Sequence, residues 1–216
     1  MKPKIFTIAA MLLLVAGSFY TCQKNENNNE LPDVTRSEGQ DGVYVWPEGP
    51  KYYYAFDEKI FLYEAPNKVV LHFDEEYLFG IQRYLQGNDI IQHVKLLEHN
   101  CIFILTTTEN ANIKALMADL KKLAGMKSVN PMYLIYGGTE AGVTDEIVVQ
   151  FKEHVTQQEI DSIHQKYRLV IKKFHPRSQL LSVPINLDPL EVANAIQESG
   201  LANYSHPNFI LQVTFP

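Results

Sequence analysis

Cysteine is scarce in this sequence, which has only two in 216 residues, Cys22 and Cys101. If Cys22 is lipidated, no disulfide can form within the chain. Cys101 opens the apolar run Cys101–Leu105, where a free cysteine behaves as a small hydrophobic side chain. A catalytic thiol needs an exposed, electropositive setting instead. We therefore predict that Cys101 is a core residue of a strand.

Positive charge is also in deficit, because 19 Lys and Arg stand against 25 Asp and Glu and give a net charge of −6. Proteins that bind nucleic acid carry clustered Lys and Arg, so we expect no nucleic-acid partner. The apolar run at residues 5–16 is too short to cross a bilayer as a helix. We therefore expect this segment to be cleaved off rather than to anchor the protein in the membrane as a helix.

Motifs for metals, cofactors and phosphates are missing. The seven histidines show neither a His-Glu-x-x-His spacing nor a cluster with cysteine. The glycines of 137–142 precede neither a Lys-Ser/Thr pair nor a helix, so they form no phosphate loop and are interpreted as a domain boundary. His72 and His154 are expected to face solvent. We predict no metal, no cofactor and no catalytic residue.

The N-terminus has the pattern of an export signal. Lys2 and Lys4 precede the apolar run, and small residues follow it before Cys22. Cys22 stands where a bacterial lipoprotein carries its lipidated cysteine, although Phe19 and Thr21 depart from the usual residues. We predict a signal peptide over residues 1–21 and lipidation at Cys22. Ordinary secretory cleavage nearby is the alternative.

A polar segment follows Cys22 and lacks any periodic apolar pattern. Its Asn- and Glu-rich start, Gln23–Glu30, cannot bury itself in a core, which is typical of a tether between a membrane and a domain. We predict a flexible tether over residues 22–42. The expected location is outside the cytoplasm, as an outer-membrane or cell-surface lipoprotein.

The rest of the chain repeats one pattern twice. Alternating apolar residues at 68–73 return at 146–151, with Val69 and Ile147 lying 78 positions apart (147 − 69). Pro131 and Pro207 lie 76 apart (207 − 131) in the closing runs. Such internal similarity indicates a duplicated fold. Each copy reads strand, helix, strand, strand, helix, strand, with strands predicted at 68–73, 90–97, 101–106 and 129–135, and at 146–151, 169–174, 179–183 and 205–211.

Helix signals are clearest in the second copy. Thr156 and Glu159 form a capping box before an apolar stripe, and Asp188-Pro189 begins a second helix that Gly200 ends. The predicted class is α+β, with two tandem ferredoxin-like βαββαβ modules at 43–136 and 144–216. The sheet face opposite the helices stays open in such a module, which suggests a partner.

An aromatic hairpin is predicted before the first copy. The runs 51–55 and 59–63 flank a short polar turn and carry four tyrosines and a phenylalanine. We interpret these side chains as cross-strand packing that caps the first copy. A platform for a sugar or a peptide is the alternative.

Four motifs of the second copy resemble a known family. They are the segments 145–151, 156–159, 188–194 and 204–210, which are similar to the N-terminal propeptide of subtilisin-like serine proteases, in particular the fervidolysin-type prodomain. The likeness covers the second copy throughout and the first more faintly. In that family the propeptide assists folding of the protease and then inhibits it.

The resemblance also implies how such a partner would be contacted. The open sheet face would pack on protease helices, and the segment after the last strand would lie in the active-site cleft like a product. That segment maps here onto a tail formed by Leu211, Val213, Thr214 and Phe215. The partners implied are a subtilisin-like serine protease and, through Cys22, a membrane.

The motifs of a subtilase catalytic domain do not accompany the propeptide-like region. Gly138-Thr139 is followed by Glu140, and Asp161-Ser162 lies inside a helix stripe. We therefore expect a non-enzyme that binds a subtilisin-like protease as an inhibitor or folding chaperone. The alternatives are a structural or adhesive surface lipoprotein, and a truncated remnant of a subtilase precursor.

Overall fold

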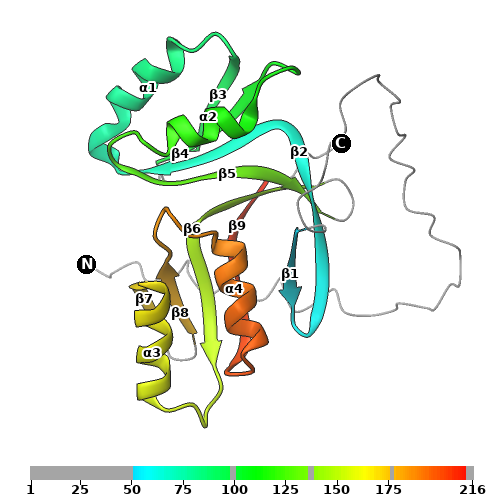
Figure 1. Cartoon of the computed structure of the whole chain (residues 1–216), viewed down its shortest axis with the longest axis vertical. Helices are drawn as coiled ribbons and strands as arrows, with labels where there is room; N and C mark the ends of the chain where they lie inside the picture. The colour runs from blue at the N-terminus through cyan, green and yellow to red at the C-terminus, as the bar shows by residue number, and fades with distance from the viewer. Residues whose placement is uncertain (1–50, 98–100, 136–138, 176–177, 213–216) are drawn as a thin grey trace, which may run out of the picture. The chain divides into compact units, whose positions relative to one another are not determined.

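The computed structural model describes residues 51–97, 101–135, 139–175 and 178–212 (Figure 1). The chain divides into two units, residues 1–45 and 46–216, and every described residue belongs to the second. The predicted signal peptide, the tether and Cys22 lie outside the described residues, as do Val213, Thr214 and Phe215. Within them, nine strands share one sheet and four α-helices accompany it, which confirms the predicted α+β class.

The first half of the sheet contains the hairpin and the first copy of the repeat. Its strands β2 and β5 pair over most of their length, and β4 pairs with the other side of β2. We call residues 51–134 the first half. Its elements are β1 (Lys51–Ala55), β2 (Glu58–Phe73), a 3-10 turn (Glu75–Tyr77), α1 (Leu78–Gln86), β3 (Ile91–Leu97), β4 (Ile102–Thr107), α2 (Ile113–Leu120) and β5 (Met126–Leu134).

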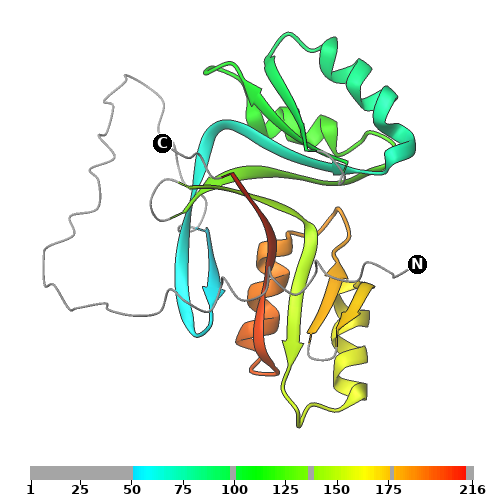
Figure 2. The ribbon, with the colours of Figure 1, turned by 180° about the vertical axis from the view of Figure 1, so that it is seen from behind.

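The second half, residues 140–212, contains the second copy. Strand β6 pairs with β8 on one side and with β9 on the other, and Figure 2 shows β9 running beside β6. Its elements are β6 (Glu140–Phe151), α3 (Gln157–Tyr167), β7 (Val170–His175), β8 (Ser178–Ser182), α4 (Pro189–Glu198) and β9 (Ala202–Gln212).

The helices begin where capping chemistry favours them. The Thr156 side chain accepts a hydrogen bond from the Glu159 amide, and the Glu159 carboxylate accepts one from the Thr156 amide, so the predicted capping box is present. Asp188 caps α4 with Pro189 at its first position, and Asn112 caps α2. Helix α1 has no side-chain cap. Local sequence therefore specifies the two helices of the second half more strongly than it specifies α1.

The strand order is the same in both halves. It is β5-β2-β4-β3 in the first and β9-β6-β8-β7 in the second, and every described pairing is antiparallel. The halves are joined by pairing of β5 with β6, in which Met132 faces Gly142 and Leu134 faces Glu140. The predicted boundary glycine, Gly142, thus lies inside strand β6, so the two copies share one continuous sheet.

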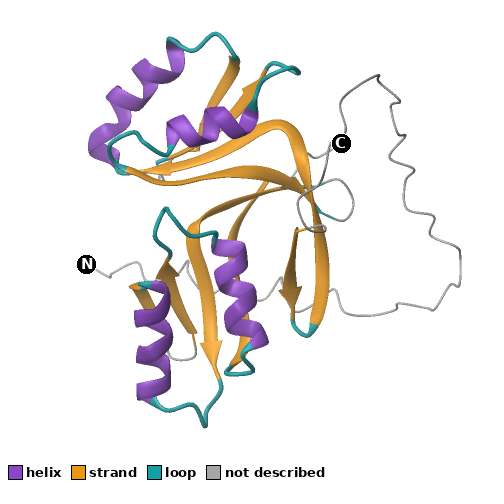
Figure 3. Ribbon diagram, in the orientation of Figure 1, coloured by secondary structure: helices purple, strands orange, loops and turns teal. Residues whose placement is uncertain are grey.

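Each half has its own apolar core between its helices and one face of its sheet (Figure 3). In the first half, Val69, Leu71 and Phe73 pack with α1 and α2. In the second half, Ile147 and Val149 pack with α3 and α4. These are the alternating residues that the sequence assigned to the buried face.

Strands β2, β6 and β9 run at least four residues longer than the sequence predicted. Strand β2 continues from the hairpin through residue 73, with a register shift between Glu64 and Val69. Strands β6 and β9 extend beyond the ranges predicted for them. They pair with each other from Glu140↔Gln212 to Phe151↔Ala202, with a bulge between Val143 and Ile147. The extensions arise from pairing between distant segments, which local patterns do not encode.

The aromatic hairpin packs against the second half rather than capping the first copy. Tyr53 lies edge-on to Phe209 of β9, with ring centroids 4.8 Å apart, and Asn194 of α4 donates a hydrogen bond to the Tyr52 carbonyl at 2.8 Å. Lys51 pairs with Asp188 and Glu191 of α4. The hairpin therefore ties the start of the described chain to its end.

Candidate functional site

The two halves present matched positions on the sheet face that carries no helices. Val70 and Val148 lie 78 positions apart, in the first strand of each copy, and each is directly paired with an apolar residue of the third strand. Those partners are Ile104 and Leu180. Because neighbours along a strand point to opposite faces, all four side chains lie opposite the helices. They allow a direct comparison of the two faces.

In the second half this face is open. We call it the helix-free face and define it by β6, β8 and β9 residues that alternate with the core positions. Val148 and Leu180 are half-buried, and Tyr204 stacks on His206 with ring centroids 5.7 Å apart. Its residues are Val148, Gln150, Leu180, Ser182, Tyr204 and His206, each of intermediate burial. The face thus mixes apolar and polar groups, as protein interfaces do.

In the first half the same face is closed. Val70 is 0% exposed and Ile104 is 6% exposed, and both pack in a cluster with Met132 and Ile210. Gly142 of β6 lies so near that a Cβ built on it would stand 2.7 Å from Val70 Cγ2. The extended ends of β6 and β9 therefore cover the first half's face with the second half's own residues.

A buried carboxylate joins the two halves beside this contact. Asp145 lies in the β6 bulge and is 2% exposed, and its carboxylate contacts the His72 ring of β2 and accepts a hydrogen bond from Ser182 at 2.7 Å. Burial by itself raises the pKa of Asp145, but the hydrogen bonds from His72 and Ser182 outweigh it and hold this pKa below its ordinary value. Asp145 is therefore an ionised anchor.

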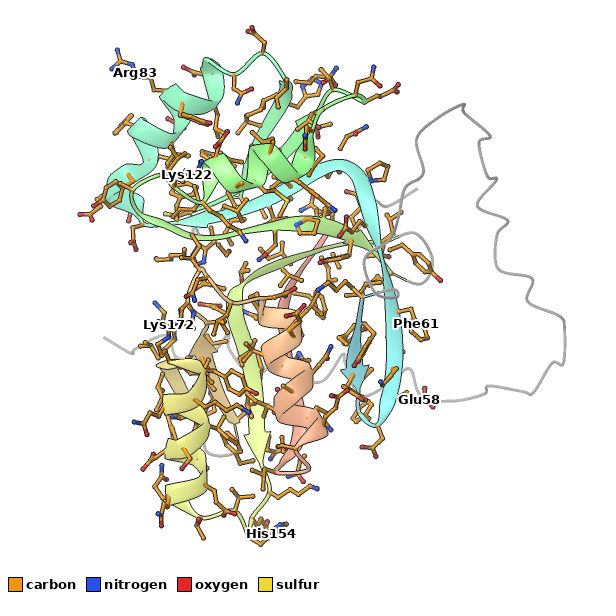
Figure 4. The ribbon with its side chains drawn as sticks, in the orientation of Figure 1. Glu58, Phe61, Arg83, Lys122, His154 and Lys172 are labelled. Atoms are coloured by element: carbon orange, nitrogen blue, oxygen red, sulfur yellow. The ribbon has the colours of Figure 1, made fainter. Side chains whose placement is uncertain are left out.

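The expectation that His72 faces solvent is wrong. Its side chain is only 13% exposed, because the second half covers the face on which it lies. His154, by contrast, is exposed at the turn between β6 and α3 (Figure 4). The sequence did indicate in part that His72 is buried. His72 lies between Leu71 and Phe73 in β2, and the neighbouring strand β4 is apolar on both faces.

The trio His72, Asp145 and Ser182 has the residue types of a hydrolase triad in the wrong arrangement. The Ser182 hydroxyl donates to the carboxylate rather than to an imidazole nitrogen, so no base takes its proton. The carboxylate is shared between two partners and orients both. The arrangement holds the halves together and activates no nucleophile.

Cys101 lies just before its predicted strand. Strand β4 begins at Ile102, and Cys101 has a left-handed backbone with φ of 50°. It is half-buried at the margin of the first core and lines an open cleft of about 490 Å³ together with His72, Lys127 and Lys172. The prediction that Cys101 lies in a strand is thus wrong, and its thiol packs at the edge of the core.

The hairpin tyrosines are engaged in contacts with α4. The Tyr52 and Tyr54 hydroxyls both donate to the Glu198 carboxylate, at 2.8 and 2.9 Å, and Lys59 lies 4.1 Å from the Tyr52 ring centroid. Tyr52 and Phe61 meet edge to face across the strands. These contacts support the packing interpretation, with α4 as the partner that the sequence did not reveal.

The predicted tail begins in regular structure. Leu211 is 53% exposed and lies in β9, where it is paired with Ala141. The other three tail residues, Val213, Thr214 and Phe215, fall outside the described residues. The chain therefore reaches residue 212 in extended conformation beside β6.

Two further properties concern the described ranges alone. Residues 51–97, 101–135, 139–175 and 178–212 hold no group of three or more His, Cys, Asp and Glu side chains placed to bind a metal ion. Over the same ranges, no helix has the length and apolar character needed to cross a membrane.

Comparison with known proteins places one family on the second half. Residues 137–208 match the model of the fervidolysin N-terminal prodomain family. Among solved structures, the acetolactate synthase small subunit from Thermotoga maritima aligns over 69% of this chain and 97% of its own, at 14% identity and a TM-score of 0.26, which is too low to carry an argument. None of the curated proteins matches the chain. Over residues 137–208, the chain therefore contains a propeptide-like domain similar to the fervidolysin prodomain, as its motifs predicted.

Proposed function

We propose that this protein binds a subtilisin-like serine protease, as an inhibitor or a folding chaperone, through the helix-free face of its second half. The observation that carries the proposal is the difference between matched positions. Val148 and Leu180 are only half-buried in the propeptide-like domain, whereas Val70 and Ile104 are buried by the chain itself. The match over residues 137–208 supports the choice of partner.

Two tandem ferredoxin-like modules account for the architecture. Each half follows the order strand, helix, strand, strand, helix, strand. In each half the first strand lies between the fourth strand and the third strand. In this proposal the first module is a brace. It holds the long strands β6 and β9 in register, so that the second module's face is formed before a partner arrives.

The helix-free face has the chemistry of a docking surface. Val148, Leu180 and Tyr204 supply apolar area, and burial of apolar surface contributes roughly 25 cal/mol per Å². Asn208 is held by a hydrogen bond to Glu146 at 2.9 Å, which fixes polar groups at the margin. A stable interface needs about 800 Å² from each partner. In this proposal the area comes from the residues of β6, β8 and β9 on this face together with the extended tail.

The tail would add strand pairing to the face contact. Leu211 is already extended in β9, so continuation through Val213, Thr214 and Phe215 would direct an extended segment toward the protease cleft. Backbone hydrogen bonds would give affinity, and alternate side chains would fill substrate pockets. We propose further that a lipid on Cys22 holds the protein at the outer membrane or the cell surface, with residues 22–42 as a tether.

The lipid proposal has a simple test. Metabolic labelling with a palmitate analogue should mark the wild-type chain and leave Cys22→Ala unmarked. Equal labelling of both chains would remove Cys22 as the lipidation site.

Binding and the role of the tail are tested together. The full mature chain and a chain ending at Leu211 are titrated against the subtilisin-like proteases encoded in the same genome, with inhibition and surface-immobilised binding both measured. Tight binding by the full chain and inhibition lost on truncation would support both parts. Unchanged inhibition would exclude the tail mechanism, and no binding to any of these proteases would contradict the proposed function.

A further inference from the structure

One segment of this acidic protein is strongly basic. Residues 162–187 contain five Lys or Arg and no Asp or Glu, whereas the whole chain carries −6 and the remainder therefore −11 (−6 − 5). The segment runs from within α3 through β7 and β8. Its basic residues are Lys166, Arg168, Lys172, Lys173 and Arg177. Such a local reversal of charge marks a surface suited to an acidic partner.

Strand β7 is at the centre of this segment and forms one edge of the sheet. It pairs with β8 and with no other described strand, so its outer side presents unpaired backbone groups. All six of its residues are exposed. Val170, Ile171 and Phe174 are 60, 49 and 69% exposed, which is unusual for large apolar side chains at a sheet edge.

The lysines of β7 have few opposing charges. Lys172 projects outward in Figure 4, and in the described residues neither Lys172 nor Lys173 forms an ion pair with a carboxylate. Strand β8, packed beside it, carries no charged residue. Three of the described acidic residues, Asp74, Glu75 and Glu146, share the cleft with Lys172, but none of them forms an ion pair with it: Asp74 pairs with Lys127, and the Glu146 carboxylate accepts a hydrogen bond from Asn208. The edge therefore retains its positive charge.

We propose that the β7 edge binds an extended, acidic polypeptide segment as an added strand. Backbone N–H and C=O groups of the segment would pair with the outer side of β7. Its apolar residues would cover Val170 or Phe174, and its Asp or Glu residues would meet Lys172 and Lys173. The site lies along the outer edge of β7, where Val170 and Lys173, paired with Ser182 and Leu180, adjoin the helix-free face proposed for the protease.

Charge decides between this occupant and others. A second copy of the chain would bring the lysines of two β7 strands together, and like charges directly opposite each other disfavour pairing. An anionic lipid surface would satisfy the lysines but would leave the edge backbone groups unpaired. The opposite sheet edge, β3, also exposes Val94 and Leu96, but its Lys95 donates a hydrogen bond to Gln212 of β9. The acidic strand fits β7.

The test uses a fluorescein-labelled peptide, Glu-Val-Asp-Ile-Glu-Val-Asp, and the full chain. Fluorescence anisotropy should show saturable binding that weakens as salt is raised. The variant Lys172→Glu with Lys173→Glu should bind with a dissociation constant about tenfold higher, because reversal of two exposed charges replaces attraction to the acidic peptide by repulsion. The matched control, Lys114→Glu with Lys121→Glu on α2, has the same change in net charge and should bind like the wild type.

Strand addition is distinguished from simple charge attraction by two more measurements. The same peptide with a central proline should bind much more weakly, because proline lacks the amide proton that the pairing needs. Bound peptide should slow amide hydrogen exchange in residues 170–175 and not in 91–97. Equal binding of the proline peptide, equal binding by the lysine variant and its control, or no saturable binding would each overturn the proposal.

Competing occupants give their own signatures, which would also overturn it. Sedimentation of the wild type as a dimer that the lysine variant abolishes would assign the edge to a second copy. Tight binding of the wild type to phosphatidylglycerol-containing vesicles, combined with no peptide binding, would assign it to a lipid surface.

Discussion

The two sheet faces of this protein differ where their sequences are most alike. Val70 and Val148 occupy matched positions in the first strand of each half, yet Val70 is completely buried and Val148 is only half-buried. The difference arises outside the strands themselves, because the ends of β6 and β9 lie over the first face and nothing described lies over the second. The helix-free surface of the first half is thus used for contacts within the chain.

The difference has an energetic consequence. The closed face contributes to folding by removing Val70, Ile104 and Met132 from water, at roughly 25 cal/mol for each Å² of apolar area. The open face contributes little to folding and stays available for binding. Substitutions at matched positions should therefore affect stability in the first half and binding in the second.

The largest effect is expected for Val70→Asp. A carboxylate at this fully buried position has no partner, so the free energy of unfolding should fall by about 4 kcal/mol or more. The matched change, Val148→Asp, should lower it by only about 1 kcal/mol, because water reaches the open face. Urea unfolding followed by circular dichroism measures both. Similar losses for the two variants would break the comparison between the faces.

The next effect concerns the buried anchor between the halves. Asp145→Asn should lower the free energy of unfolding by about 2 kcal/mol at neutral pH, since it loses hydrogen bonds to an ionised carboxylate. Asp119→Asn, which affects an exposed pair with Lys122, should change it by no more than about 0.5 kcal/mol.

The pH dependence of the Asp145 effect has a definite sign. The pKa of Asp145 is lower in the folded protein than in the unfolded chain, so its stabilisation is complete above the unfolded value of about 3.9. That stabilisation is lost as the pH falls through the folded pKa. The gap between wild type and Asp145→Asn should therefore narrow in acid, and a gap that stays constant would contradict the assignment.

A loss of about the same size is expected from the close approach of β6 to the first face. Gly142→Ala would place a Cβ 2.7 Å from Val70, and the shift needed should lower the free energy of unfolding by about 2 kcal/mol. The control is Gly80→Ala in α1, where a Cβ meets nothing within 4 Å and the helix should gain about 0.5–1 kcal/mol. Thermal unfolding of the two variants should shift in opposite directions.

The smallest effect tests the local specification of the second half. Thr156→Ala removes the cap of α3 and should lower the free energy of unfolding by about 1 kcal/mol. Thr156→Ser keeps the hydroxyl and should restore most of it. If the alanine and serine variants unfold alike, the capping box contributes nothing measurable.

Local signals in the sequence predicted the helices and cores, and distant contacts account for what they did not predict. The capping box at Thr156 and the Asp188-Pro189 pair placed α3 and α4 correctly because they act within a few residues. The burial of His72 and the partner of the tyrosine hairpin depend on segments 73 and more than 100 positions away. Their partners are set by the pairing of β6 with β5 and β9.

The contrast between the closed and the open sheet face could have been predicted in part from the sequence. The run Ile102–Leu105 is apolar at every position, which is typical of a strand buried on both faces. In the second half the corresponding strand, Ser178–Ser182, is polar at three of its five positions and apolar at Leu180 and Leu181 alone. The contrast between a closed and an open face was thus present in the third strands, although the sequence did not show what covers the first.

The most direct test is the inhibition of a subtilisin-like protease from the same genome by two variants, one altered at the open face and one altered where β6 covers the closed face. Inhibition constants are measured for the wild type, for Val148→Asp with Leu180→Asp, and for Gly142→Ala as a variant altered at the closed face. We expect the double variant to remain folded and to inhibit at least about 100-fold more weakly, and Gly142→Ala to inhibit like the wild type below its unfolding temperature. Inhibition by the folded double variant at wild-type strength would contradict the assignment of the open face as the protease-binding surface.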